Sequence, residues 1–111
     1  EEMFGAEPEH GWCYYYQQAD LARQRGEWEL IPSLHKEALQ NGYYPEDSIE
    51  WMPFIQAYAV LGDVEKVRDL AKIISSDRFL QMQTCTNLND FMETETVSDE
   101  IQGVIENSLC P

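Results

Sequence analysis

The chain has 111 residues, enough for one domain with a modest hydrophobic core. Its 21 acidic residues outnumber its 7 basic residues, which gives a formal charge of −14, and no lysine or arginine follows Arg78. This charge disfavours nucleic acid and anionic membranes as partners. It leaves two interpretations, a solvated acidic surface or a docking face for a basic partner.

No apolar run reaches the roughly 20 residues that a membrane-spanning helix needs, and no signal-peptide pattern occurs. We therefore expect no direct membrane insertion by this part of the chain. The sequence starts Glu1-Glu2 without an initiator methionine, so we expect a piece of a longer polypeptide. Residues 1–10 are acidic, contain Gly5 and Pro8 and lack periodicity, which predicts a flexible lead-in before a single domain at 11–111.

Two stretches with helical spacing of apolar residues predict a first hairpin. One runs from about Trp12 to Arg25, and the other from about Glu27 to Gln40, where Asn41-Gly42 ends it. Pro32 lies inside the second stretch and lacks a backbone N–H, so we expect an irregular first turn there. The residues expected to face inward are Trp12, Tyr15, Ala19, Ala22, Trp28, Ile31, Leu34, Ala38 and Leu39.

The second predicted hairpin begins with Asp47 as the cap of a helix and Glu50 as its reciprocal partner. Pro53 again predicts an irregular first turn. Gly62 suits the left-handed conformation that ends a helix, and Asp63 can cap the next helix, which runs to about Ser75. The expected inward residues are Trp51, Phe54, Ile55, Tyr58, Leu61, Val64, Val67, Leu70, Ala71 and Ile74.

The last two predicted helices form a third hairpin. The first runs from about Arg78 to Glu93 after a capping segment at 75–77, and its apolar stripe is the poorest, with Leu80 or Gln81, Thr84, Leu88, Phe91 and Met92. A linker at 94–97 follows. Ser98 then caps the final helix, whose clean apolar face consists of Ile101, Val104, Ile105 and Leu109.

The first two hairpins are similar to each other in sequence. LARQRGEWELIPSLHKEAL aligns with AYAVLGDVEKVRDLAKII through Gly26 and Gly62, a period of 36 residues (62 minus 26). Such a period is typical of helical repeat arrays. Trp51, Tyr58, Gly62 and Asp63 resemble the tryptophan, tyrosine and glycine-acid turn of a tetratricopeptide repeat, whose usual period is about 34 residues.

This resemblance implies an all-α fold of about six helices, arranged as antiparallel hairpins in a short right-handed array. The repeats would cover about 12–44 and 47–77, with a divergent terminal hairpin at about 78–110. His35 stands where the family has a large apolar residue and Ile74 where it has alanine, which makes the repeats degenerate.

In such an array the first helix of each hairpin lines the concave, ligand-binding face. Tyr16, Asp20, Met52 and Gln56 carry no fixed positive charge, so they cannot form the clamp that some repeats of this family use for a peptide's terminal carboxylate. Tyrosines 14–16 and Met52 instead suggest an adaptable groove for a peptide, although the tyrosines could equally pack between hairpins. The expected groove residues are Cys13, Tyr16, Asp20, Arg23, Gln24, Met52, Gln56, Ala59 and Val60.

The sequence predicts no catalytic residues, no metal site and no cofactor. His10 and His35 have no histidine or cysteine at the spacing of helical zinc ligands, and His35 is expected to pack. No phosphate-binding loop, nucleophile elbow or calcium loop occurs. The paired acids, such as Glu93 with Glu95, are typical of linkers and first helical turns rather than of general acid–base pairs.

Cysteine usage leaves two possibilities open. Cys13 is expected to be a free thiol. Cys85 and Cys110 lie on the two helices of the last hairpin, where Cys110 would stand about one helical turn from Cys85. Either these two form a disulfide, as in an oxidising compartment, or all three thiols are reduced.

A second resemblance involves HGWCYYYQQADLARQRGEW, PEDSIEWMPFIQAYAVLGD and a loose match ending at Leu109-Cys110. These phrases resemble the soluble C-terminal domain of bacterial polytopic membrane proteins of the glycosyltransferase type, related to protein mannosyltransferases. The resemblance implies a membrane-embedded enzyme elsewhere in the parent protein, with this domain tethered outside the cytoplasm, or alternatively inside it. It carries over no catalytic residue to this chain.

We therefore expect a non-catalytic interaction or scaffolding module for a protein or peptide, which could be the membrane-embedded part of its own chain. The alternative is a carbohydrate-binding or lipid-glycan-binding domain that uses exposed aromatic rings. Burial of Trp12, Trp28 and Trp51 distinguishes the two, because a sugar platform must face water.

Overall fold

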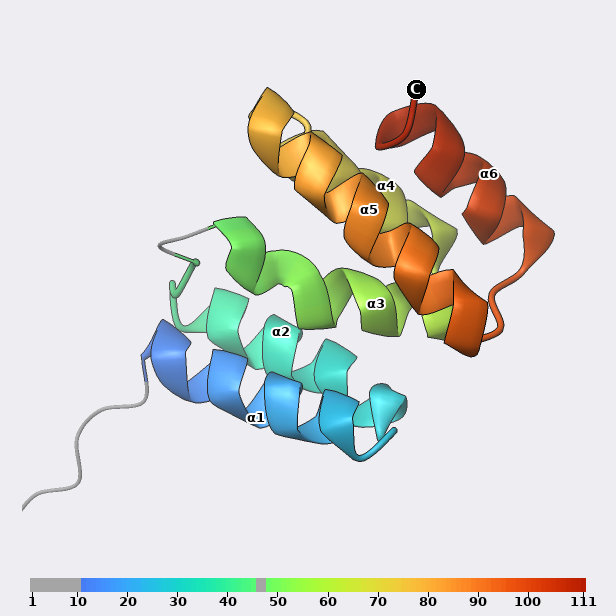
Figure 1. Cartoon of the computed structure of the whole chain (residues 1–111). Coiled ribbons are helices and arrows are strands. Elements are labelled where there is room, and N and C mark those ends of the chain that lie inside the picture. The colour runs from blue at the N-terminus through green and yellow to red at the C-terminus, as the bar shows by residue number, and fades with distance from the viewer. Residues whose placement is uncertain (1–10, 46–47) are drawn as a thin grey trace, which may run out of the picture.

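Six α-helices in antiparallel pairs make up the part of the chain that our computed structural model describes, residues 11–45 and 48–111 (Figure 1). No strand occurs among these residues, which confirms the predicted all-α class. The helices are α1 (Trp12–Gln24), α2 (Ile31–Gln40), α3 (Met52–Leu61), α4 (Val64–Ile74), α5 (Arg78–Thr94) and α6 (Asp99–Ser108). The 3-10 turns η1 (Trp28–Leu30) and η2 (Ser48–Trp51) precede α2 and α3.

Both 3-10 turns have the same cause. Pro32 and Pro53 each lie in the first turn of an α-helix, where the missing N–H has no intrahelical acceptor in any case. Further inside a helix, a proline ring would clash with the carbonyl one turn earlier. The chain therefore winds as a tighter helix before each proline, which confirms the expected irregular first turns.

Local signals also set the helix ends. Gly62 has a φ of 80°, in the left-handed region, and ends α3 as predicted. The side chains of Asp63, Asp77 and Ser98 accept hydrogen bonds from the backbone N–H groups of Lys66, Leu80 and Ile101 and so cap α4, α5 and α6. Helix α5 ends at Thr94, one residue beyond its predicted end. The predicted cap at Asp47 lies outside the described residues.

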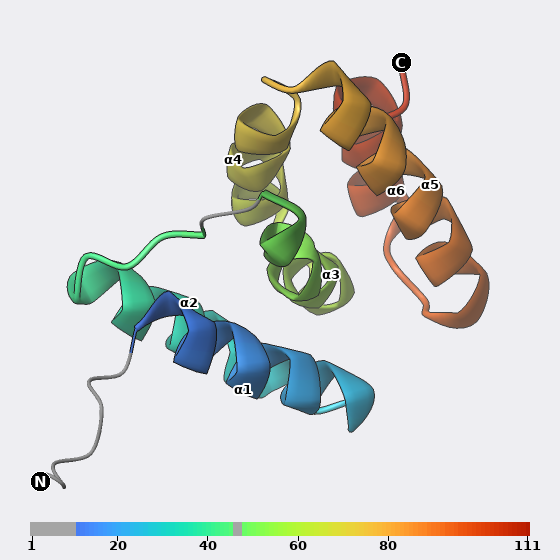
Figure 2. The ribbon, with the colours of Figure 1, turned by 60° about the vertical axis from the view of Figure 1, so that its left-hand side comes forward.

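Helix α3 occupies the centre of the array and contacts α1, α2, α4 and α5 (Figure 2). Its residues from Pro53 to Ala59 are all buried, so it is enclosed on nearly every side. The exception is its last residue, Leu61, which was predicted to face inward but is 45% exposed. Tyr58 and Ala59 in the same turn are buried, so Leu61 lies on the side of this turn that faces solvent.

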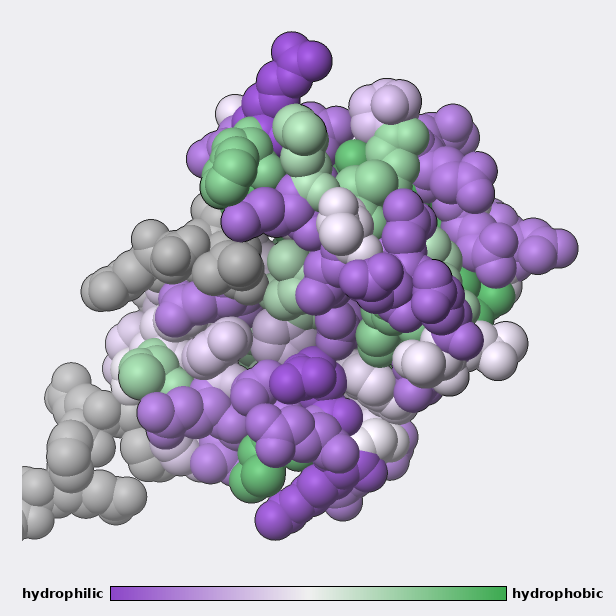
Figure 3. Space-filling view, in the orientation of Figure 1, coloured by the Kyte–Doolittle hydropathy of each residue, from purple (hydrophilic) through white to green (hydrophobic). Residues whose placement is uncertain are grey.

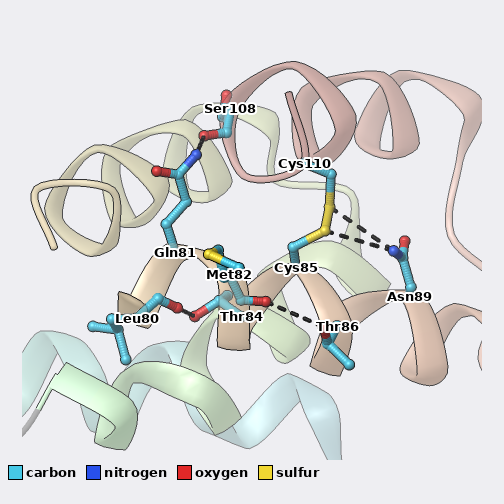
Figure 4. The surroundings of a disulfide bond; sticks show 9 residues. All are labelled: Leu80, Gln81, Met82, Thr84, Cys85, Thr86, Asn89, Ser108 and Cys110. Atoms are coloured by element: carbon cyan, nitrogen blue, oxygen red, sulfur yellow. Dashed lines mark hydrogen bonds between the residues drawn. A yellow bond between two sulfur atoms is a disulfide. The ribbon is translucent and has the colours of Figure 1, made fainter. Parts of the chain in front are cut away.

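The third hairpin closes one end of the array. A disulfide joins Cys85 of α5 to Cys110 just beyond α6, and Gln81 donates a hydrogen bond to the carbonyl of Ser108 in the same region (Figure 4). From the sequence alone, either a disulfide between these two cysteines or reduced thiols was expected. Helix α6 nevertheless packs more extensively against α4 than against α5, and its Ile101 and Ile105 are fully buried. The last hairpin is thus fixed by α4 and by the disulfide.

None of the described helices combines the length and the apolarity that crossing a membrane would require.

Candidate functional site

The five groove residues predicted on α1 lie at or near the surface. Cys13 and Gln24 are exposed, and the other three are half-buried. Asp20 accepts hydrogen bonds from the Nε of Arg23 at 2.8 Å and from the Nε2 of Gln24 at 3.0 Å. Asp20, Arg23 and Gln24 therefore form a small polar network along α1. In this network the positive charge of Arg23 is already paired with Asp20.

The four groove residues predicted on α3 do not share one surface. Met52 and Val60 are half-buried, but Gln56 and Ala59 are only 5% and 1% exposed and cannot line an open groove. The reason is the neighbouring α5, because the Nε2 of Gln56 donates a hydrogen bond to the Oδ1 of Asn87 on that helix at 2.9 Å. For Gln56 the prediction was wrong because it did not include the packing of α5 against α3, and it was wrong for Ala59 because this residue belongs to the buried core.

A groove between α3 and α5 has a different lining from the one predicted. It is a hollow of about 490 Å³ that we call the α3–α5 groove, lined by Met52, Phe79, Met82, Gln83, Thr86 and Asn87. Phe79 and Met82 are 70% and 63% exposed, although both are large and apolar. They leave a hydrophobic patch at the surface, one of the features that mark binding sites.

The space-filling view agrees with this description. In Figure 3 hydrophobic side chains are exposed over the N-terminal part of α5, while much of the surrounding surface is hydrophilic. Sequence reasoning missed Phe79 and Met82, although a signal was present. Both lie off the stripe of α5 that includes Leu80, Thr84 and Leu88, so they are apolar residues on the outward side of an amphipathic helix.

Negative charge lies next to the groove. Glu50 of η2 accepts a hydrogen bond from the indole Nε1 of Trp12 at 3.0 Å and stands two residues before Met52. Burial raises the pKa of the Tyr16 phenol, and the carboxylates of Asp20 and Glu50 raise it further. The nearby Arg23 acts on this pKa in the opposite direction, but the net shift is upward, so the phenol is neutral at physiological pH.

The tryptophans belong to the core. Trp12, Trp28 and Trp51 are 8%, 9% and 5% exposed. Trp12 and Trp51 meet edge to face at 5.7 Å between ring centroids, and Trp28 meets Phe91 of α5 in the same way at 5.5 Å. Tyr15 is also buried, with its hydroxyl donating to Glu37 at 2.7 Å. No indole ring is left at the surface to stack on a sugar.

The other residues singled out in the sequence are the cysteines and His35. Cys13 is an exposed free thiol, and Cys85 and Cys110 are bridged. His35 is buried, as expected, and shares a hydrogen bond of 2.6 Å between its Nδ1 and the hydroxyl of Tyr58. Within residues 11–45 and 48–111, no three histidine, cysteine, aspartate or glutamate side chains are grouped to hold a metal ion.

Comparison with known proteins found no match for this chain among family models, curated proteins or solved structures. The two resemblances described above therefore stay predictions from the sequence.

Proposed function

We propose that this chain is a non-catalytic protein-interaction module that binds a peptide segment of a partner in the α3–α5 groove. The observation that carries the proposal is the exposure of Phe79 and Met82 beside Met52, around a hollow in a hydrophilic surface. A peptide lying there would bury these side chains, at about 1.5 to 3 kcal/mol for each one that is fully covered.

The lining suits a peptide more than a rigid small molecule. Methionine side chains are flexible and polarisable and adapt to ligands of different shapes. Gln83, Thr86 and Asn87 add amide and hydroxyl groups that can bond to a peptide backbone, which always presents N–H and C=O groups. The groove thus combines apolar anchoring points with polar groups on α5.

The negative charge of the protein indicates which charge the bound peptide should carry. The chain carries −14 overall, no basic residue follows Arg78, and the carboxylate-bearing Glu50 stands two residues before Met52 of the groove. A segment with lysine or arginine next to its apolar anchors would be attracted to this surface, whereas an acidic one would be repelled. We therefore propose a basic, partly apolar peptide. We propose in addition that the parent protein is membrane-bound and glycosyltransferase-like, and that a segment of this parent can supply the peptide.

A random-peptide display selection against the protein tests the proposal. The wild type should enrich peptides with apolar anchors flanked by basic residues. The substitutions Phe79→Ser and Met82→Ser should each weaken binding of those peptides by about tenfold or more. Leu30→Ser is the matched control, because Leu30 is 48% exposed in η1 but does not line the groove, and it should leave binding unchanged.

Two outcomes would overturn the proposal. One is a selection that enriches no peptide family. The other is enriched peptides that bind Phe79→Ser and Met82→Ser as tightly as the wild type. If binding of the enriched peptides depended instead on the surface of α1 around the exposed Cys13, the binding site would lie on the first hairpin.

A further inference from the structure

A second hollow, of about 520 Å³, lies where α2, the end of α3 and the start of α4 come together. It is lined by Pro32, His35, Lys36, Leu39, Gln40, Tyr58, Asp63 and Lys66. We call it the lysine hollow. None of these residues lines the α3–α5 groove, so an experiment on this hollow tests a different site from the proposed peptide-binding groove. Its volume is within the range of roughly 300 to 1,000 Å³ that is typical of small-ligand pockets.

The lysine hollow has a fixed polar base. His35 is 5% exposed, and its Nδ1 lies 2.6 Å from the hydroxyl of Tyr58. The imidazole is held by ring contacts with Trp51, at 5.2 Å between centroids, and with Phe54, at 5.4 Å. A hydrogen-bonded pair locked by aromatic packing presents the same polar atoms to any ligand without rearranging.

That base is uncharged at neutral pH. Burial, and then the nearby positive charge of Lys66, lowers the pKa of His35 to about 4. Burial, and then the carboxylate of Asp63, raises the pKa of Tyr58 to about 12. The charges in the lysine hollow are therefore those of the two lysines and of Asp63.

The two ammonium groups outnumber the one carboxylate. Neither Lys36 nor Lys66 forms an ion pair with a carboxylate in the described part of the chain, although acidic residues outnumber basic ones 21 to 7. The carboxylate of Asp63 is already engaged, since it accepts a hydrogen bond from the backbone N–H of Lys66 at 3.2 Å. Two lysines on different helices, turned toward one hollow and unpaired, are suited to an anion.

We propose that the lysine hollow binds a small organic anion, with its carboxylate or phosphate group at Lys36 and Lys66 and its apolar body against Pro32 and Leu39. The imidazole and phenol of the base would add hydrogen bonds. Free carboxylates and phosphate monoesters share this chemistry, and the probes below separate them. An inorganic ion alone would leave the apolar side of the hollow uncovered.

The test is a titration followed by amide NMR of the whole chain, with benzoate and phenyl phosphate as probes. We expect saturable shifts around Lys36 and Lys66 with at least one probe at concentrations up to about 10 mM. Benzyl alcohol lacks the charge and inorganic phosphate lacks the ring, so each should bind at least about tenfold more weakly than the better probe.

Variants link the signal to the two lysines. Lys36→Ala with Lys66→Ala should weaken binding by about tenfold or more. Arg68→Ala with Lys72→Ala is the matched control, because it also removes two positive charges, both from α4 and outside the hollow, and it should have little effect. All four side chains are exposed, so none of these substitutions should unfold the protein.

The imidazole supplies an independent readout. An anion bound beside His35 favours the charged ring, so its pKa should rise when the better probe saturates the wild type, and no such rise should occur in the doubly substituted Lys36 and Lys66 variant. The proposal is overturned if neither probe gives saturable shifts, if the double variant binds like the wild type, or if benzyl alcohol or inorganic phosphate binds as well as the probes.

Discussion

Trp51 connects the first two hairpins at the level of a single side chain. Its indole makes edge contacts with Trp12 of α1 at 5.7 Å, with His35 of α2 at 5.2 Å and with Phe54 of α3 at 6.1 Å between centroids. Three helices thus meet at one ring, and aromatic pairs of this geometry add to the burial energy of each ring. Trp51 is accordingly a structural residue.

The substitution Trp51→Ala should lower the free energy of unfolding by about 3 to 5 kcal/mol, because it leaves a large cavity among these rings. Urea denaturation measures the loss. Tyr44→Ala is the control, since Tyr44 is 63% exposed and should change stability little. An unchanged unfolding midpoint for Trp51→Ala would show that the indole is a surface platform, as the carbohydrate-binding alternative requires.

His35 should make stability depend on pH. Its pKa is about 4 in the folded protein against 6.5 in an ordinary environment, because burial and Lys66 disfavour the charged ring. The unfolded chain therefore binds more protons between these values, and the free energy of unfolding should fall as the pH drops from about 6.5 toward about 4. Above about 6.5, His35 should contribute no pH dependence. The groups that face it are Lys36, Tyr58, Asp63 and Lys66.

Two measurements check this prediction. An NMR titration of the His35 ring, assigned with His35→Gln, should give a midpoint well below 6.5. Urea denaturation at several pH values should show a steeper loss for the wild type than for His35→Gln, which has no imidazole. A ring that titrates near 6.5, or identical slopes for the two proteins, would be inconsistent with a buried neutral His35.

At the level of the helices, two glycines have opposite roles. Gly62 ends α3 with a φ of 80°, a conformation that a side chain makes unfavourable by roughly 1 to 2 kcal/mol. Gly103 lies inside α6, and a Cβ added there meets no atom within 4 Å. Gly62→Ala should therefore destabilise the protein by about 1 kcal/mol or more, whereas Gly103→Ala should stabilise it by about 1 kcal/mol. Thermal unfolding should show shifts of opposite sign, and shifts of the same sign would refute this assignment.

The disulfide should hold the third hairpin. It closes a loop with a sequence separation of 25 residues, which restricts the unfolded chain by about 3 kcal/mol. Reduction should lower stability mainly in α5 and α6, as amide hydrogen exchange would show.

Thiol titration of denatured, oxidised protein should find one free thiol, Cys13, and Cys13→Ser should leave stability unchanged because this thiol is exposed. Three free thiols after mild oxidation would contradict the bridge.

The helices could be predicted because their signals are local. Gly62, Asp63, Asp77 and Ser98 act within one turn of the chain, and the apolar spacing of each helix does not depend on its partner. The surface sites could not be predicted in the same way. Gln56 finds its hydrogen-bond partner in Asn87, 31 residues away, and the lysine hollow combines residues of α2, α3 and α4 that only tertiary packing brings together.

At the level of the whole molecule, α3 is buried at the centre of the array and the tryptophans belong to the core. The outward residues of α5 remain exposed to solvent. The α3–α5 groove is the resulting apolar surface on an otherwise acidic protein. Peptide binding should therefore weaken as salt concentration rises, because screening removes the attraction between the acidic surface and a basic peptide. Affinity measured by isothermal titration at low and high salt checks this, and an affinity that rises with salt would exclude a basic partner.

The most direct test of the account uses the methionine methyl groups as reporters. Met52 and Met82 line the α3–α5 groove, whereas Met92 is half-buried near the other end of α5. With ¹³C-labelled methionine methyl groups, a peptide from the display selection should shift the signals of Met52 and Met82 and leave that of Met92 in place. Shifts at Met92 with Met52 and Met82 unchanged would contradict the proposed peptide-binding groove.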